Sequence, residues 1–194
     1  MLYDLYFRHG QTEWNVSKRL QGHKPITLNE KGREEAKTLA EKIKDLDFDR
    51  IISSDLLRAK ETAEIINEKV HKEIVLDARL RSVDYGNLEG RFIPDITQEE
   101  WKIYNSTPEK FGAESVESVY TRIKSLFDEL VKTDDSVLIV AHGGALRIIS
   151  YYIANRQLFN NEIYCKFYKD AKQVDNAALF EWKKEFTKLK LIYY

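Results

Sequence analysis

The sequence predicts an α/β fold in three layers, with a mainly parallel central sheet flanked by helices. Short apolar runs alternate along the chain with longer segments in which apolar residues recur at helical spacing. Residues 137–141 read Val-Leu-Ile-Val-Ala, which is typical of a strand buried on both faces of a parallel sheet. No repeat, low-complexity tract or flexible linker divides the 194 residues. We therefore expect a single domain over residues 1–194.

The chain begins with a predicted strand, a helix and a second strand. Residues 2–7 are apolar and aromatic and lead into the motif Arg-His-Gly, which predicts a buried strand followed by a loop. Asn29 is a suitable N-cap for a helix over residues 30–46, whose apolar residues fall on one face. Residues 50–53 then predict the second strand.

The middle of the chain continues the alternation and then becomes irregular. The spacing of apolar residues predicts a helix over residues 56–70, and residues 74–76 predict another short strand. Glycine and proline interrupt the pattern over residues 77–112. Within that segment we expect only a short helix, over residues 98–104.

The last part of the chain returns to regular alternation. A helix is expected over residues 115–132, followed by the buried strand at 137–141 and a helix over residues 145–154. Residues 177–182 and 189–193 predict a terminal pair of strands.

The composition argues against several classes of partner. The 31 basic and 32 acidic residues nearly cancel and form no long run of like charge, so we expect neither nucleic acid nor a membrane as a partner. The N-terminus lacks the pattern of a signal peptide, and no apolar run approaches the roughly 20 residues that span a bilayer. Cys165 is the one cysteine, which excludes an internal disulfide and favours a cytoplasmic location.

Histidine and arginine residues follow two of the predicted strands. Arg8 and His9 come directly after residues 2–7, and His142 comes directly after residues 137–141. Ligands collect at the carboxyl ends of the strands in an α/β sheet. We therefore expect the two histidines to meet in one cleft.

These residue types suit the transfer of a phosphoryl group. Such a reaction needs cationic donors around the phosphoryl oxygens and a nucleophile in line with the leaving oxygen. Arg8 and Arg58 offer planar guanidinium groups that match phosphate, His9 offers a nitrogen lone pair, and His142 offers a further donor. Gly143 permits close approach of the substrate to the backbone. An ordinary surface position on a helix remains an alternative for Arg58.

A metal centre is the competing interpretation of a histidine site. His9, His23, His71 and His142 do not have the two-histidine spacing of a helical zinc site, and no cysteine pair accompanies them. His23 lies in a loop before Pro25, where it could contact substrate. Because arginine and histidine already offset the charge of a phosphate, we expect no metal and no cofactor.

Several segments, in order, resemble those of the histidine phosphatase superfamily, the phosphoglycerate mutase-like proteins. The resemblance covers most of the chain and implies their layered fold. It also implies that His9 takes the phosphoryl group, that Arg8, Arg58 and His142 bind it, and that Asn15, Gln21, Gly22 and Gly143 lie on the substrate side. The matching segments are residues 8–15, 28–32, 53–63, 112–115 and 141–144.

One position departs from the family pattern. The family commonly has a glutamate as proton donor after Leu-Arg, whereas this chain has Ser82 there. A serine hydroxyl is a weak acid, and a positioned general acid typically contributes roughly 100-fold to 10,000-fold, so we expect reduced turnover. Asp84, Glu89 or a water molecule are the candidate substitutes, and a laboratory substitution at position 82 is a further explanation.

The resemblance implies a phosphatase of small phosphate monoesters. The mutases of the family have an insertion after the region of Glu89, which this chain lacks, so it is more similar to the branch with alpha-ribazole phosphatase. Two alternatives stay open. One is a protein that binds phosphate esters with little turnover, and the other is a phosphoglycerate mutase. The natural substrate and the oligomeric state are left open.

Overall fold

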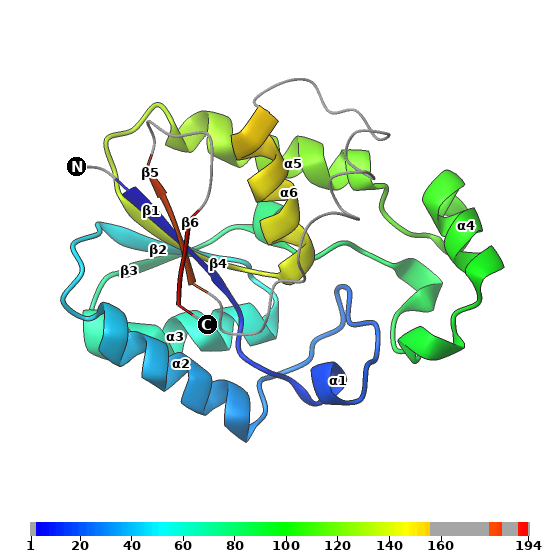
Figure 1. The fold of residues 1–194 in the computed structure, drawn as a ribbon, viewed down its shortest axis with the longest axis horizontal. Helices are drawn as coiled ribbons and strands as arrows, with labels where there is room; N and C mark the ends of the chain where they lie inside the picture. The colour runs from blue at the N-terminus through cyan, green and yellow to red at the C-terminus, as the bar shows by residue number, and fades with distance from the viewer. Residues whose placement is uncertain (1–2, 156–178, 184–189, 194) are drawn as a thin grey trace.

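A six-stranded sheet runs through the centre of the protein (Figure 1). The computed structural model describes residues 3–155, 179–183 and 190–193, so Cys165 lies outside it. The strand order is β3-β2-β4-β1-β5-β6. The strands are β1 (Tyr3–Arg8), β2 (Arg50–Ser53), β3 (Glu73–Leu76), β4 (Val137–Ala141), β5 (Leu179–Lys183) and β6 (Lys190–Tyr193).

Four neighbouring strands of the sheet are parallel. β1 pairs with β4, β4 with β2, and β2 with β3, each in parallel register. β5 and β6 are added at one edge in antiparallel register. The predicted α/β fold with a mainly parallel sheet is confirmed, and residues 50–53 and 137–141 form strands with the predicted bounds.

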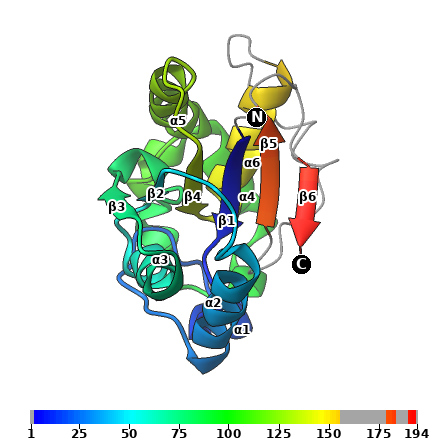
Figure 2. The same cartoon turned by 90° about the vertical axis from the view of Figure 1, so that its left-hand side faces the viewer.

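Within the described part of the chain, two helices cover each face of the sheet (Figures 1 and 2). α2 (Glu30–Ile43) and α3 (Leu57–Val70) pack on one face, and α5 (Val116–Leu130) and α6 (Gly143–Asn155) on the other. Side chains alternate between the faces along β1, since Tyr6 belongs to one core cluster. Leu5 and Phe7 belong to the other.

The sequence prediction also located the helix boundaries closely. Asn29 is the N-cap of α2, and its side-chain oxygen accepts a hydrogen bond from the N–H of Gly32. The helix ends at Ile43 rather than at residue 46, because the N–H of Leu46 bonds the carbonyl of Ile43 in a tighter turn. Leu46 still packs against the core, which explains why its apolar character suggested a longer helix.

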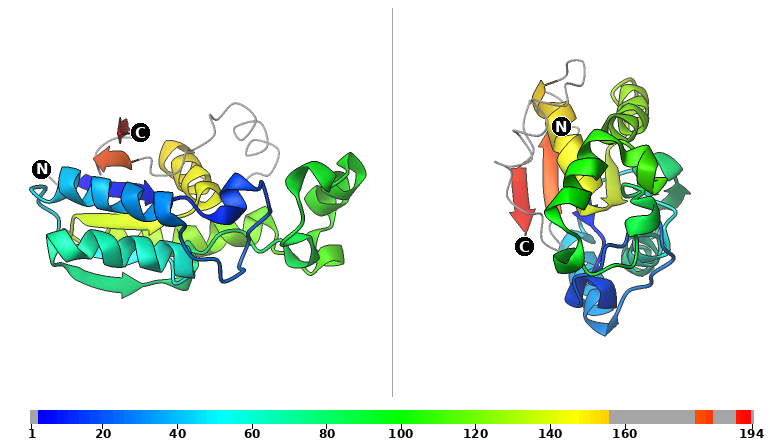
Figure 3. Two further views of the ribbon diagram at one scale, coloured as in Figure 1. Left: turned by 90° about the horizontal axis from the view of Figure 1, so that it is seen from below. Right: turned by 90° about the vertical axis from the view of Figure 1, so that its right-hand side faces the viewer.

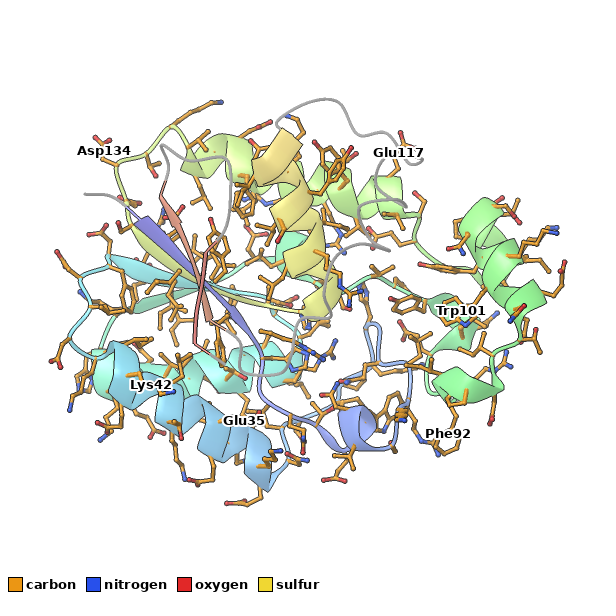
Figure 4. The ribbon with its side chains drawn as sticks, in the orientation of Figure 1. Glu35, Lys42, Phe92, Trp101, Glu117 and Asp134 are labelled. Atoms are coloured by element: carbon orange, nitrogen blue, oxygen red, sulfur yellow. The ribbon has the colours of Figure 1, made fainter. Side chains whose placement is uncertain are left out.

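A lobe of short elements extends beyond the carboxyl ends of the parallel strands (Figure 3). Phe92 and Trp101 lie in this lobe, at the opposite end of the molecule from Asp134 (Figure 4). The predicted short helix at 98–104 is present as α4 (Gln98–Ser106). The short elements that the sequence pattern did not predict are α1 (Glu13–Val16) and the 3-10 helices η1 (Ala78–Leu80), η2 (Gly86–Leu88), η3 (Ile93–Asp95) and η4 (Pro108–Phe111).

None of the helices in the described ranges is both long and apolar enough to cross a membrane.

Candidate active site

His9 and His142 lie side by side at the carboxyl ends of β1 and β4. The N–H of His9 donates to the carbonyl of Ala141, at a distance of 3.0 Å. The centroids of the two imidazole rings are 5.1 Å apart. His9 is 3% exposed and His142 is 1% exposed. The structure thus brings together two residues that are far apart in the sequence, as their positions after parallel strands predicted.

The backbone of the following residue fixes the proton of His9. Nδ1 of His9 is 2.7 Å from the carbonyl oxygen of Gly10, which can only accept a hydrogen bond. The proton of the neutral ring is therefore on Nδ1, and Nε2 carries the lone pair. Burial lowers the pKa of His9 well below its usual value, and the nearby cations Arg58 and Arg8 lower it further. His9 is accordingly neutral at pH 7.

Arg58 is buried beside this lone pair. Its side chain is 1% exposed, so the alternative of an ordinary surface residue is wrong. Its Nε donates to Nε2 of His9 at 3.2 Å. Its two terminal nitrogens donate to the carbonyls of Gly22 and Lys24, at 2.9 and 3.3 Å. Burial lowers the pKa of Arg58 to about 10, with Arg8 lowering it and Glu89 raising it, which leaves the guanidinium charged at neutral pH.

His142 has a different set of partners. Its Nε2 is 2.9 Å from the hydroxyl oxygen of Ser54. Its Nδ1 is buried and makes no hydrogen bond within the part of the chain that the structure describes. Burial, Arg58 and His9 lower its pKa well below the usual value, so this ring is also neutral at pH 7.

These groups open onto a cavity of about 220 Å³. Four arginines of the described residues contribute to its wall, two of which the sequence reasoning missed: Arg19 and Arg147. Arg147 follows Gly143 by one helical turn of α6, a spacing that could have indicated it. Tyr85 is a further missed wall residue. The wall consists of Arg8, His9, Arg19, Leu20, Gln21, Gly22, Arg58, Ser82, Tyr85, His142, Gly143, Gly144 and Arg147.

Asn15 is the one predicted site residue that is not part of this wall. It lies in α1, where its side-chain oxygen accepts hydrogen bonds from the backbone N–H and the hydroxyl of Thr12, both at 3.0 Å. Its own N–H donates to the hydroxyl of Thr12. The two residues form a capping box, which orders the loop after the Arg-His-Gly motif.

Ser82 lies in the cavity wall on a braced loop. Its carbonyl accepts hydrogen bonds from Nε2 of His23, at 2.8 Å, and from a terminal nitrogen of Arg122, at 2.9 Å. Arg122 also donates to the carbonyls of Arg79 and Arg81 and forms an ion pair with Glu114. The backbone of this loop is therefore held from two sides.

The two carboxylates considered as substitutes for the missing acid hold the same loop. Asp84 accepts a hydrogen bond from the N–H of Gly86 and lies 3.7 Å from Nδ1 of His23. Glu89 accepts from the N–H groups of His23 and Tyr85, at 2.7 and 3.2 Å. Neither belongs to the residues that line the cavity. Both carboxylates therefore order the loop from outside the cavity.

Within residues 3–155, 179–183 and 190–193, no three histidine, cysteine, aspartate or glutamate side chains are grouped as a metal ion requires. Among the described residues, the cavity wall instead holds four arginines and two neutral histidines beside Gln21, Ser82 and Tyr85, and no acidic side chain, a set that suits an anion.

Comparison with known proteins identifies relatives of both the sequence and the fold. The family model of the histidine phosphatase superfamily (branch 1) matches residues 5–163. A probable phosphoglycerate mutase GpmB from Enterobacter sp. (strain 638) is 36% identical over 154 residues, which cover 75% of this chain and 72% of that protein. The protein of the same name from Salmonella paratyphi A is 37% identical with the same coverage.

Solved structures share the fold over nearly the full length. A mycobacterial glucosyl-3-phosphoglycerate phosphatase superposes with a TM-score of 0.75 at 26% identity, covering 98% of this chain and 96% of that chain. A putative alpha-ribazole-5'-P phosphatase from Escherichia coli K-12 superposes with a TM-score of 0.82 at 20% identity, covering 99% of this chain and 96% of that chain.

Proposed function

Because the chain belongs to the histidine phosphatase superfamily (branch 1), we propose that it hydrolyses small phosphate monoesters through a phosphohistidine intermediate at His9. The observation that carries this proposal is the state of His9. It is a buried, neutral imidazole whose Nδ1 proton is bound by Gly10, so that the Nε2 lone pair is held at the cavity beside Arg58.

The reaction follows from this arrangement in two steps. The phosphoryl group of the ester enters the cavity between Arg8 and Arg58, which offset its charge. The hydrogen bond from Nε of Arg58 to Nε2 of His9 opens, and Nε2 attacks phosphorus. The bond to the ester oxygen breaks, and the alcohol leaves after gaining a proton. Water then attacks phospho-His9, the phosphorus–nitrogen bond breaks, and inorganic phosphate leaves. The arginines act in both steps, because both transfer the same charged group.

The described residues of the cavity wall include no aspartate or glutamate that could protonate the leaving group. Ser82 occupies the place of the family's glutamate, and Asp84 and Glu89 are engaged elsewhere. Water is then the remaining proton source among the three candidates. Such an enzyme hydrolyses esters with acidic leaving groups, such as p-nitrophenyl phosphate, much faster than alkyl esters.

The phosphohistidine is directly measurable. The protein is mixed with a ³²P-labelled aryl phosphate, quenched in alkali, and analysed for label on the chain. We expect label that survives alkali and is lost in acid, and none on His9→Gln. His71→Gln is the matched control, because His71 is an exposed helix C-cap outside the cavity. Label that persists in His9→Gln would contradict the proposal.

The relatives named phosphoglycerate mutase favour mutase activity as a second candidate. In a mutase, phospho-His9 returns its phosphoryl group to a hydroxyl of the substrate instead of to water. Bisphosphoglycerate then stimulates the interconversion of the two monophosphoglycerates. Release of inorganic phosphate without such stimulation favours the phosphatase.

The substitution at Ser82 favours a third candidate, a protein that binds phosphate esters with little turnover. In that case a phosphate ester binds in the cavity, but neither aryl nor alkyl esters are hydrolysed. Rapid hydrolysis of p-nitrophenyl phosphate removes this candidate.

A further inference from the structure

Ser54 connects the strand that precedes Arg58 with the strand that carries His142. It follows β2 directly, and its side chain is fully buried. Its N–H donates to the carbonyl of Val140 on β4, at 3.0 Å. Its own carbonyl accepts a hydrogen bond from the hydroxyl of Ser53, at 2.9 Å. The backbone of Ser54 is thus fixed relative to the strand that ends at His142.

The hydroxyl of Ser54 has two neighbours with hydrogen-bonding capacity. Its oxygen accepts a hydrogen bond from the N–H of Leu56, at 3.3 Å, and lies 2.9 Å from Nε2 of His142. The second contact can be made in two ways. Either Ser54 donates its proton to Nε2, or Nε2 carries a proton and donates to Ser54.

The first arrangement leaves one buried polar group without a partner among the described residues, the Nδ1–H of His142, whereas the second leaves two, Nδ1 and the proton of Ser54. If the oxygen of Ser54 accepted both hydrogen bonds, its own proton would need another acceptor, and the described residues offer none beyond Nε2 of His142. A buried hydroxyl proton without an acceptor is strongly disfavoured. Ser54 is therefore the donor, and Nε2 of His142 is the acceptor.

We propose that Ser54 is a positioning residue that holds neutral His142 with its proton on Nδ1, so that this N–H donates to the phosphoryl group during transfer. The inference rests on the proposed function for the identity of the ligand. Nδ1 is the ring nitrogen that remains for a ligand, because it is buried and has no hydrogen-bond partner among the described residues. With the proton on Nε2 instead, Nδ1 would present a lone pair to an anionic oxygen and repel it.

The same tautomer thus serves opposite purposes in the two histidines. In His9, the carbonyl of Gly10 holds the proton on Nδ1 and leaves Nε2 as nucleophile. In His142, the hydroxyl of Ser54 occupies Nε2 and leaves Nδ1 as donor. The partner of each ring therefore decides its role. The carbonyl at Nδ1 makes His9 a nucleophile, and the hydroxyl at Nε2 makes His142 a donor.

The test measures the tautomer directly by ¹⁵N NMR of the uniformly labelled protein at pH 7.5, with His142→Gln used to assign the signals. In the unmodified chain we expect His142 to be protonated on Nδ1. In Ser54→Ala we expect the proton to move to Nε2 in a large share of molecules. We also expect the affinity for inorganic phosphate to fall about tenfold, the loss expected for one hydrogen bond to a charged group.

Ser53→Ala is the matched control. It removes an equally buried hydroxyl that bonds the carbonyl of Ser54 rather than His142, while the hydrogen bond from the N–H of Ser54 to Val140 still holds Ser54 against β4. We expect it to leave the tautomer of His142 and the phosphate affinity unchanged, even where it lowers thermal stability.

Two results would overturn the inference. One is an unmodified chain in which His142 carries its proton on Nε2, and the other is a Ser54→Ala variant whose tautomer and phosphate affinity are unchanged. Neither depends on turnover. Failure of the inference is therefore distinguishable from failure of the proposed function. If the proposed function fails, His9 takes no ³²P label although His142 carries its proton on Nδ1.

Discussion

Nε of Arg58 donates a hydrogen bond to Nε2 of His9 over 3.2 Å, and both side chains are buried. The arginine therefore contacts the nitrogen that is proposed to take the phosphoryl group. Since a carbonyl holds each of its terminal nitrogens, the guanidinium plane is fixed before substrate arrives. The bond to His9 has to open for attack, but the two carbonyl contacts keep the positive group oriented as charge develops in the transition state.

Arg58→Lys is expected to lower kcat/KM for p-nitrophenyl phosphate by at least about 100-fold, the magnitude found for one fixed donor to developing charge. Lysine keeps the charge but cannot reach His9 and two carbonyls with a planar group. Steady-state kinetics measure the effect. Arg33→Lys is the control, because Arg33 lies outside the cavity wall, forms a partly exposed ion pair with Glu61 and should tolerate the change. A loss below about threefold in Arg58→Lys would contradict the role.

Ser82→Glu is expected to raise turnover of an alkyl phosphate at least about tenfold, because a carboxylic acid can protonate the leaving alkoxide. The gain should be smaller for p-nitrophenyl phosphate, whose leaving group needs little protonation. The isosteric control is Ser82→Gln, which has the shape of glutamate but no acidic proton. Equal effects of the two substitutions on the alkyl ester would mean that shape, not acidity, is responsible.

The stability of the protein is expected to fall as the pH drops below about 6.5, the usual pKa of histidine. The folded-state pKa values of His9 and His142 lie well below that value. Between the two values the unfolded chain binds more protons, so stability is fully present above pH 6.5 and is lost toward lower pH. Each histidine contributes at most about 1.4 kcal/mol per pH unit.

Thermal unfolding measured from pH 7.5 to 5 tests this expectation. His9→Gln and His142→Gln should each reduce the slope of Tm against pH, whereas His71→Gln should leave it unchanged. The range stops at pH 5 because the carboxylates of Asp55, Glu100 and Asp128 have lowered pKa values and titrate in more acidic solution. An unchanged slope in both active-site variants would contradict the burial of neutral histidines.

Arg122→Met is expected to destabilise the fold by about 3 kcal/mol, as when one partner of a largely buried ion pair is removed. The side chain is 19% exposed, and it donates to the loop carbonyls of Arg79, Arg81 and Ser82 besides pairing with Glu114. Urea unfolding measures the loss. Arg33→Met, which breaks an ion pair at a side chain 38% exposed, should cost less than about 1 kcal/mol. Similar losses in the two variants would refute the bracing role.

The regular part of the fold could be predicted because burial dictates its sequence pattern. β4 has no polar residue and is fully buried, so its bounds were predictable from composition alone. α1 could not be predicted, because four residues are too few to display a helical period. Its start is encoded instead by the reciprocal bonds of Thr12 and Asn15, which also explain why Asn15 caps a helix rather than facing the cavity.

The site residues that follow strands could be predicted from the sequence, whereas those that tertiary packing brings to the cavity could not. His9 and His142 follow strands, so topology alone brought them together. Arg147 reaches the cavity from a helix, and a lone arginine on a helix is usually a surface residue. Nothing in the sequence near Asp84 and Glu89 indicates that their carboxylates accept hydrogen bonds from backbone N–H groups.

The pairing of β1 with β4 has a kinetic consequence. These strands are far apart in the sequence, since Phe7 lies opposite Val140 in their register. Contacts between such distant segments form slowly, because a long loop must close before they add stability. During refolding, catalytic activity should therefore return only with the last phase, after the helical circular dichroism has recovered.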